Sequence, residues 1–97
     1  MFARITTAYF PTNRADEVIE ILGNDILPSA KSQNGFRGFY AFSDRKTGKG
    51  ITISLWDTEE DAIANEKSGY FNEQSSKLSP YFITAPIREG YEVSVRG

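Results

Sequence analysis

Two strand-like segments joined by a short polar loop constrain the fold of this chain more than any other feature. Residues 50–56 read GITISLW, an alternation with a period of two, and residues 36–44 are also alternating and rich in aromatic side chains. The loop between them, 45–49, is polar and contains a glycine. Alternation of this kind is typical of strands, and so short a connection favours an antiparallel pairing. The sequence therefore predicts a central β-hairpin.

A strand and a broken helix are predicted before this hairpin. Residues 3–10 are rich in β-branched and aromatic side chains, which is typical of a strand. Apolar residues then recur every three or four positions along an amphipathic helix, for which Asn13 is the expected N-cap. These positions are Ala15, Val18, Ile19, Leu22 and Ile26. Gly23 and Pro28 predict a kink or break between them, with a second helical piece running to about residue 33.

A second helix and a last strand are predicted after the hairpin. Thr58 is the expected N-cap, with Asp61 reaching back to it and acidic residues at the positive end of the helix dipole. We expect this helix to break at about Gly69 and a further helical piece to span residues 70–78. Residues 87–95 alternate between apolar and polar side chains, as a strand with one buried face would.

The order of these elements, β-α-β-β-α-β, predicts a ferredoxin-like α+β fold, a four-stranded antiparallel sheet with the helices on one face. We expect one domain over residues 1–97. Both faces of the central hairpin carry apolar side chains, yet two helices cover only one face. Because an exposed apolar sheet of this size usually marks an interface, we expect a homodimer in which two sheets pack face to face.

Composition excludes several classes of function. Eleven Lys and Arg against thirteen Asp and Glu give a net charge of −2, which argues against a nucleic-acid partner. Residues 37–42 partly match the signature of RNA-recognition motifs, but that signature belongs on the third strand of the fold and this segment is the second. The chain has no cysteine and no histidine, which excludes thiol nucleophiles, imidazole bases and zinc or haem sites held by those residues. No segment is typical of a signal peptide or a membrane span, so we expect a cytoplasmic protein with no membrane partner.

Four segments in this order resemble the antibiotic biosynthesis monooxygenase-like family. They read GFRG at 35–38, DRKTGKG at 44–50, SLWDTEED at 54–61 and GYEV at 90–93. The best single mark is Trp56 at the end of a strand, directly followed by an acidic helix start. The resemblance spans nearly the whole chain. It implies a dimeric α/β barrel with a cavity in each subunit between the sheet and the helices.

The haem-degrading branch of that family places three residues around the haem: an asparagine of the first strand, the tryptophan of the third strand and a histidine of the second helix. Trp56 matches the tryptophan, but the asparagine position holds Thr6 and the histidine position holds Glu66. A carboxylate is a poor substitute for an imidazole axial ligand. We therefore expect no haem, no metal and no other cofactor, and we keep Thr6 and Glu66 as candidates for the substrate pocket.

The resemblance to the quinone-forming branch implies chemistry that needs no cofactor. A deprotonated phenolic substrate gives an electron directly to O₂, and the protein supplies a dry pocket and groups that stabilise the developing charge. Candidates are Trp56 as an aromatic wall and indole donor, Tyr40 or Tyr70 as phenolic hydrogen-bond groups, Arg37 as an anion stabiliser and Thr6 as a small polar group. The larger residues have structural alternatives: Trp56 can pack in the core, Arg37 can form an interface or surface ion pair, and the tyrosines can lie at the edge of the core or of an interface.

Two functions remain open from the sequence. One is a cofactor-independent monooxygenase acting on a small aromatic or polyketide-like substrate in a pocket within each subunit. The other is a non-catalytic dimeric module that binds a small apolar metabolite or serves as a scaffold. A cavity beside Trp56 of ~300 Å³ or more, with polar groups converging on it, would favour the first.

Overall fold

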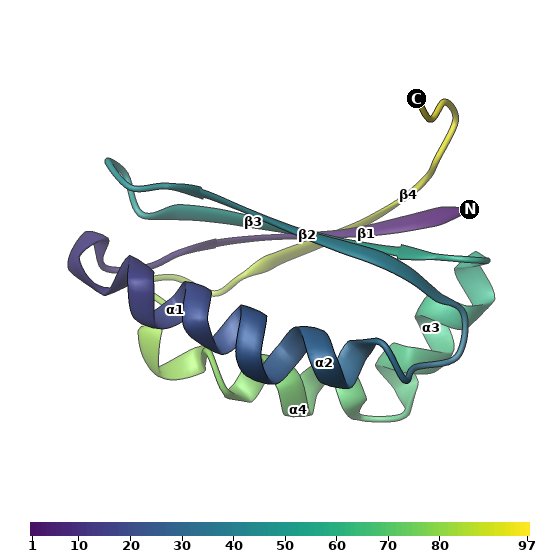
Figure 1. Ribbon diagram of the computed structural model, residues 1–97, viewed down its shortest axis with the longest axis horizontal. Helices are drawn as coiled ribbons and strands as arrows, with labels where there is room; N and C mark the ends of the chain where they lie inside the picture. The colour runs from purple at the N-terminus through teal and green to yellow at the C-terminus, as the bar shows by residue number, and fades with distance from the viewer.

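A four-stranded antiparallel sheet forms one layer of the computed structural model, which describes residues 1–97 (Figure 1). The strands are β1 (Phe2–Tyr9), β2 (Phe36–Asp44), β3 (Lys49–Trp56) and β4 (Ile87–Glu92). They lie in the order β2-β3-β1-β4, and every neighbouring pair is antiparallel. This arrangement confirms the predicted ferredoxin-like fold.

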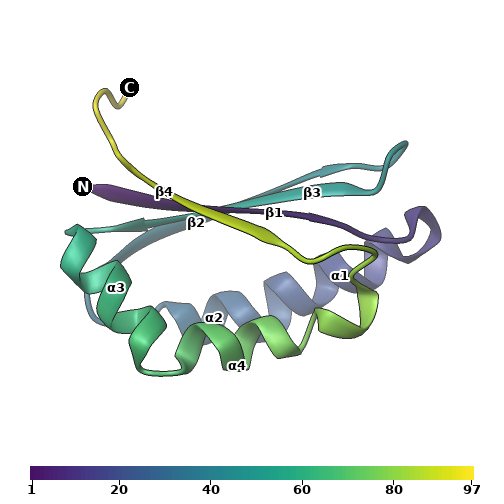
Figure 2. The same ribbon diagram turned by 180° about the vertical axis from the view of Figure 1, so that it is seen from behind.

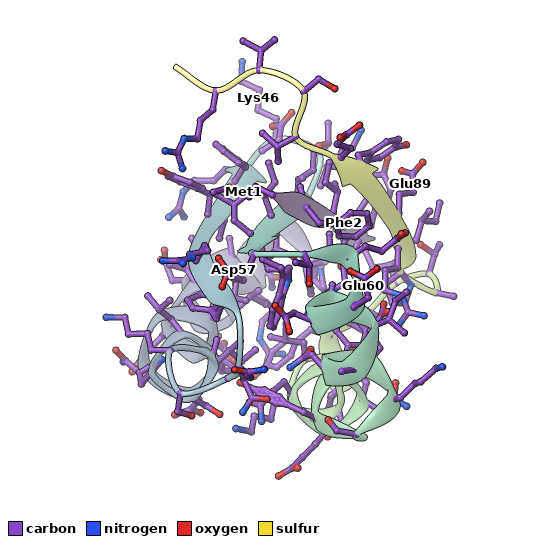
Figure 3. The ribbon with its side chains drawn as sticks, turned by 90° about the vertical axis from the view of Figure 1, so that its right-hand side faces the viewer. Met1, Phe2, Lys46, Asp57, Glu60 and Glu89 are labelled. Carbon is purple, nitrogen blue, oxygen red and sulfur yellow. The ribbon has the colours of Figure 1, made fainter.

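Two helical arms form the second layer and lie side by side on one face of the sheet (Figures 1 and 2). The first arm consists of the 3₁₀ turn η1 (Thr12–Arg14), α1 (Ala15–Ile21), the π turn η2 (Leu22–Ile26) and α2 (Leu27–Ala30). The second consists of α3 (Glu59–Lys67), α4 (Tyr70–Ser76) and the 3₁₀ turn η3 (Ser79–Tyr81). None of these helices combines the length and the apolar character that a membrane span requires. Figure 3 shows the arms end-on, with the C-terminal residues on the other side of the sheet.

The first arm stays continuous across its predicted break. Pro28 has no backbone N–H and its ring crowds the preceding turn, so an ordinary α-helical ladder cannot pass through it. The backbone instead widens into the π turn Leu22–Ile26, which Pro28 follows at the start of α2. Figure 1 shows α1 and α2 as one rod, so the expected kink is a change of helical pitch, and α2 ends at Ala30.

Two predicted boundaries are wrong. Asn13 does not cap the first helix; it lies within η1, which the hydrogen bond from Arg14 N to Pro11 O closes at 2.9 Å. The last strand ends at Glu92 and not at residue 95. Glu92 is paired with Phe2, the first residue of β1, and the bond from Val93 N to Met1 O at 2.9 Å lies just beyond this pair.

The start of α3 follows its prediction in part. Thr58 is the N-cap, and its Oγ1 accepts a hydrogen bond from Asp61 N at 3.1 Å. The Asp61 carboxylate does not reach back to Thr58, because its Oδ1 instead accepts a 3.4 Å hydrogen bond from Asn34 Nδ2. As predicted, α3 and α4 are separated at Gly69, whose φ of 86° suits a residue without Cβ.

The two faces of the sheet differ in how they are covered. The core lies between β1 and the helical arms, with six buried residues: Ala8, Phe10, Val18, Leu22, Ile26 and Leu78. On the other face, Tyr40 stacks on Phe42 with ring centroids 6.3 Å apart, and both are more than half exposed. Ile87 and Tyr91 extend this apolar face along β4. Nothing within the chain covers it.

Candidate functional site

A cavity of about 400 Å³ lies between the sheet and the helical arms. This volume is within the ~300–1,000 Å³ range of small-molecule sites. One end is apolar and lined by Phe10, Val18, Leu22, Ile26, Leu78 and Phe82. The other end has polar walls, formed by Arg4, Thr6, Gln33, Ser54, Asn65 and Tyr70. The site is therefore amphiphilic, with its buried polar residues, Arg4, Ser54 and Asn65, at one end. Three exposed residues of the β2–β3 hairpin also line the cavity: Ser43, Asp44 and Lys49.

Trp56 forms part of the polar end although its indole is almost fully buried, with 1% exposure. Its Nε1 donates a 3.0 Å hydrogen bond to Ser54 Oγ, two residues earlier on β3. The ring of Phe36 meets the indole edge-on, with centroids 5.7 Å apart. Because Nε1 already has an acceptor within the protein, Trp56 serves this site as a fixed aromatic wall.

Arg4 is the buried charge of the site. It lies on β1 opposite Ser54 of β3 and Gly90 of β4, and only 8% of the residue is exposed. Its Nη2 donates to Asn65 Oδ1 at 3.1 Å and its Nη1 to the Ala62 carbonyl at 3.4 Å. These bonds attach the guanidinium to α3, which is why a strand residue near the N-terminus can be held inside the fold.

Two aromatic rings flank this guanidinium. Its Cζ lies 5.1 Å from the centroid of the Trp56 ring and 4.5 Å from that of Phe71. Contacts of this kind stabilise a cation through the negative face of the ring. Burial nevertheless lowers the pKa of Arg4 to about 10; the Glu66 carboxylate opposes this fall and the charge of Arg88 adds to it. Arg4 is thus still a cation at neutral pH, although its surroundings disfavour the charge.

The Glu66 carboxylate forms ion pairs with two arginines, and the two distances differ. Its Oε1 is 2.9 Å from Arg88 Nε and 4.0 Å from Arg4 Nη1. Arg88 also lies over Phe71, with its Cζ 4.8 Å from the ring centroid. The charges of Arg4, Arg88 and Glu66 sum to one positive charge. Because Glu66 forms its close ion pair with Arg88, the charge of Arg4 is the one that is less well compensated.

Hydrogen bonds between elements fix the polar end. Asn65 Nδ2 donates to Gln33 Oε1 at 3.1 Å and thereby ties α3 to the segment after α2. The Tyr70 hydroxyl donates to Ser29 Oγ at 2.9 Å, which connects α4 to α2. Every buried side-chain nitrogen and oxygen atom has a partner within the protein. The site is therefore preorganised, and a ligand would meet groups that are already oriented.

The structure brings together some of the residues expected from the sequence and separates others. Thr6, Trp56 and Tyr70 line the cavity, and Glu66 contacts it through Arg4. The other two candidates lie outside it. Arg37 forms an exposed ion pair with Asp57, and Tyr40 stands on the open face of the sheet.

Three residues of the site were not expected from the sequence: Arg4, Asn65 and Gln33. A signal for Arg4 is present, since it shares the inward register of β1 with Thr6 and Ala8, and a charge at an inward strand position is unusual. The two amides carry no such signal, because their roles depend on contacts between distant segments. No group of three or more His, Cys, Asp or Glu residues is placed to hold a metal ion.

Comparisons with known proteins identify the fold. No family model and no curated protein matches the sequence. Solved structures do match. A protein from Bordetella bronchiseptica assigned to the antibiotic biosynthesis monooxygenases superposes with a TM-score of 0.82 at 12% identity, over 97% of both chains. The heme-degrader MhuD of Mycobacterium tuberculosis, whose structure holds two hemes in its active site, gives 0.81 at 14% identity, over 100% of this chain and 99% of that one.

A third match carries a different ligand. The monooxygenase from the ActVA-Orf6 gene of Streptomyces coelicolor, solved with nanaomycin D, gives a TM-score of 0.74 at 16% identity, over 99% of this chain and 88% of that one. Sequence identity this low supports a shared fold and not a shared activity.

Proposed function

This chain has the fold of the antibiotic biosynthesis monooxygenases, and we propose that it oxidises a small electron-rich phenol with O₂ and without a cofactor. The observation that carries the proposal is the cavity of about 400 Å³ with a buried cation at one end. Its apolar end suits the flat body of an aromatic or polyketide-like substrate. Its polar end suits the oxygen atom at which negative charge develops.

The proposed reaction draws its electrons from the substrate. The phenol loses its proton to water at the open side of the cavity, and the Arg4 charge, flanked by Trp56 and Phe71, stabilises the phenolate. A phenolate transfers an electron to O₂ far more readily than a phenol does. A hydroquinone then loses two electrons and two protons in all, giving the quinone and H₂O₂. An anthrone exchanges its CH₂ for C=O, and the second oxygen atom of O₂ leaves as water.

The residues present do not fit a histidine-ligated haem. The chain contains no histidine or cysteine, and Glu66, which occupies the expected ligand position, is held by Arg88 at 2.9 Å. The Tyr70 hydroxyl is bonded to Ser29. No step of the proposed reaction passes through haem.

A non-catalytic binding module is the alternative, and one observation favours it. Glu66, the carboxylate beside Arg4, is paired with Arg88, and the chain has no imidazole, so no free base stands next to the buried cation. Asp44, the carboxylate that lines the cavity at the hairpin, accepts hydrogen bonds from the backbone N–H groups of Lys46 and Thr47. On this alternative the cavity holds an aromatic metabolite and releases it unchanged.

Oxygen uptake distinguishes the two functions. Purified protein treated with EDTA, without added flavin, is given a panel of anthrones and hydroquinones in an oxygen electrode. We expect uptake above the uncatalysed rate, a strong loss in Arg4→Gln and no loss in Arg37→Gln, whose arginine lies outside the cavity. Binding without uptake across the whole panel would favour the binding module.

A homodimer is part of the proposal. Tyr40, Phe42, Ile87 and Tyr91 leave a largely apolar sheet face exposed, and a second copy would cover it with an identical surface. Analytical ultracentrifugation at micromolar concentrations tests this: a single well-folded monomeric species would contradict it.

We also retain the cytoplasmic location expected from the sequence, which fractionation of the native cells tests.

A further inference from the structure

We propose that the cavity takes its ligand as an anion, a planar aromatic carboxylate or phenolate whose oxygen atoms accept hydrogen bonds from Arg4. The inference deepens the proposed function and rests on the same cavity. It concerns recognition and not turnover, so it holds equally for an enzyme and for a binding module.

The first support is the charge balance at the polar end. Arg4 and Arg88 share one carboxylate, and Glu66 lies 2.9 Å from Arg88 but 4.0 Å from Arg4. Charged groups are rarely buried without a close partner of opposite charge, because the interior solvates them poorly. Arg4 is 8% exposed, and its one ion pair, with Glu66, is long at 4.0 Å. A ligand anion would supply the closer partner that the free protein lacks.

The second support is the number of free donors on Arg4. A guanidinium carries five N–H groups in a planar fork that matches the two oxygen atoms of a carboxylate. Arg4 donates two hydrogen bonds, and both acceptors are neutral: the Asn65 amide and the Ala62 carbonyl. Because Arg4 lines the cavity, its unused donors are within reach of a bound molecule. The low pKa of Arg4 agrees with a cation short of compensation.

The third support is the shape of the surroundings, which selects an aromatic anion over a small inorganic one. The guanidinium Cζ lies 5.1 Å from the ring centroid of Trp56 and 4.5 Å from that of Phe71. The cavity continues from it toward Phe39 and the apolar end. A molecule that follows this path has its charged group at Arg4 and a flat apolar body beyond it.

A pair of matched ligands tests the inference. 2-Naphthoate and 2-naphthamide have nearly the same shape, differ by one charge and are not hydroquinones, so their binding is independent of turnover. Isothermal titration calorimetry at pH 7.5 should show naphthoate binding at least about tenfold more tightly, as charge-assisted hydrogen bonds predict. Equal affinities, tighter binding of the amide, or no binding of either at millimolar concentration would overturn the inference.

Three variants locate the effect. Arg4→Gln should abolish the preference for naphthoate, and Arg37→Gln should leave it unchanged. Glu66→Gln removes the competing carboxylate but keeps a hydrogen-bonding side chain beside Arg88, so it should strengthen naphthoate binding severalfold. A gain in affinity cannot arise from misfolding, which keeps the test valid even if Arg4→Gln is poorly folded. Unchanged or weaker naphthoate binding in Glu66→Gln would count against Arg4 as the anchor.

A second probe separates a phenolate from a carboxylate. The absorbance of 2-naphthol distinguishes its neutral and ionised forms, so a titration with and without protein measures the pKa of the bound phenol. We expect that pKa to fall by about one unit or more if phenolates bind at Arg4. An unshifted naphthol beside tight naphthoate binding would restrict the ligand class to carboxylates. Anion preference without oxygen uptake would refute the oxygenase alone; uptake of neutral substrates without anion preference would refute this inference alone.

Discussion

Replacing Arg4 by methionine should leave the protein as stable as before or slightly more stable. Methionine has a similar length and no charge, so the change removes the buried cation without opening a large cavity. The usual result of truncating a buried side chain is a loss of about 2–5 kcal/mol. Arg4 is expected to differ because its charge is incompletely compensated in the free protein.

The magnitude follows from the contacts of Arg4. The fall of its pKa to about 10 corresponds to about 3 kcal/mol against the charged form, since one pKa unit is worth about 1.4 kcal/mol. The variant loses two hydrogen bonds, to Asn65 and, at the longer distance of 3.4 Å, to the Ala62 carbonyl, which together cost about 1–2 kcal/mol. It also loses contacts with two aromatic rings worth about 1 kcal/mol. The balance is a gain of about 0–1 kcal/mol for Arg4→Met.

Urea unfolding followed by the fluorescence of Trp56, the only tryptophan, measures this difference. Both proteins must be compared at one concentration, because association adds to apparent stability. Arg37→Met is the control: its exposed ion pair should be worth less than about 1 kcal/mol. A loss of more than about 1.5 kcal/mol in Arg4→Met would refute the reasoning that this charge is retained at a cost.

The difference in stability between Arg4→Met and the parent protein should depend on pH. Because burial lowers the pKa of Arg4, the folded state releases this proton at a lower pH than the unfolded state does. The loss of stability caused by burying the charged form of Arg4 is therefore fully present at neutral pH and fades as the pH rises above about 10. The difference in free energy of unfolding between Arg4→Met and the parent protein should shrink between pH 8 and pH values above 10. A difference that grows with pH would contradict the view that the buried charge of Arg4 is its cause.

Three further outcomes are expected. Thr58→Ala should lower the free energy of unfolding by about 1 kcal/mol, because Asp61 N loses its acceptor, whereas Thr84→Ala on an exposed loop should change it little. Tyr40→Lys should shift the sedimentation of a dimer toward the monomer, while Glu20→Lys on the outside of α1 should not. Titration with hemin should give no saturable one-to-one Soret band; such a band would show that another residue serves as axial ligand.

Local patterns were sufficient to predict the elements and their order. The alternation in β3 and the Thr58 cap that follows it are read from residues close together in the sequence, and both are present in the structure. Boundaries that depend on distant segments were less accessible. β4 ends at Glu92, opposite Phe2 of β1, and no pattern within residues 87–95 shows this pairing.

The side chains of β2 show how a single irregularity changes a site prediction. Phe36 pairs with Trp56 and Gly38 with Leu55, so Arg37 is an extra residue in a β-bulge. A bulge reverses the alternation of every residue that follows it. Phe39 therefore faces the cavity, and Tyr40 faces the open side of the sheet. The bulge is defined by how β2 pairs with β3, and the sequence of β2 alone does not show this pairing.

Arg4 was missed for a related reason. An arginine is ordinarily solvated, and the only local sign of burial is that Arg4 shares a face of β1 with Thr6 and Ala8. Its main partner, Asn65, lies 61 positions away on α3. Only the pairing of β1 with β3 and the packing of α3 against the sheet bring the two together.

The π turn in the first arm lets the chain carry one residue more than a regular helix without moving the wall of the cavity. A π turn holds one residue more than an α turn, so a chain shorter by one residue at Asn24 could pass from α1 to α2 as a regular helix. Because either kind of turn completes about one rotation around the helix axis, the positions beyond the deletion would keep their faces. Ile26 and Ala30 would still border the cavity. A change of length at this one turn can therefore be absorbed while the cavity wall, the sheet and Arg4 stay in place.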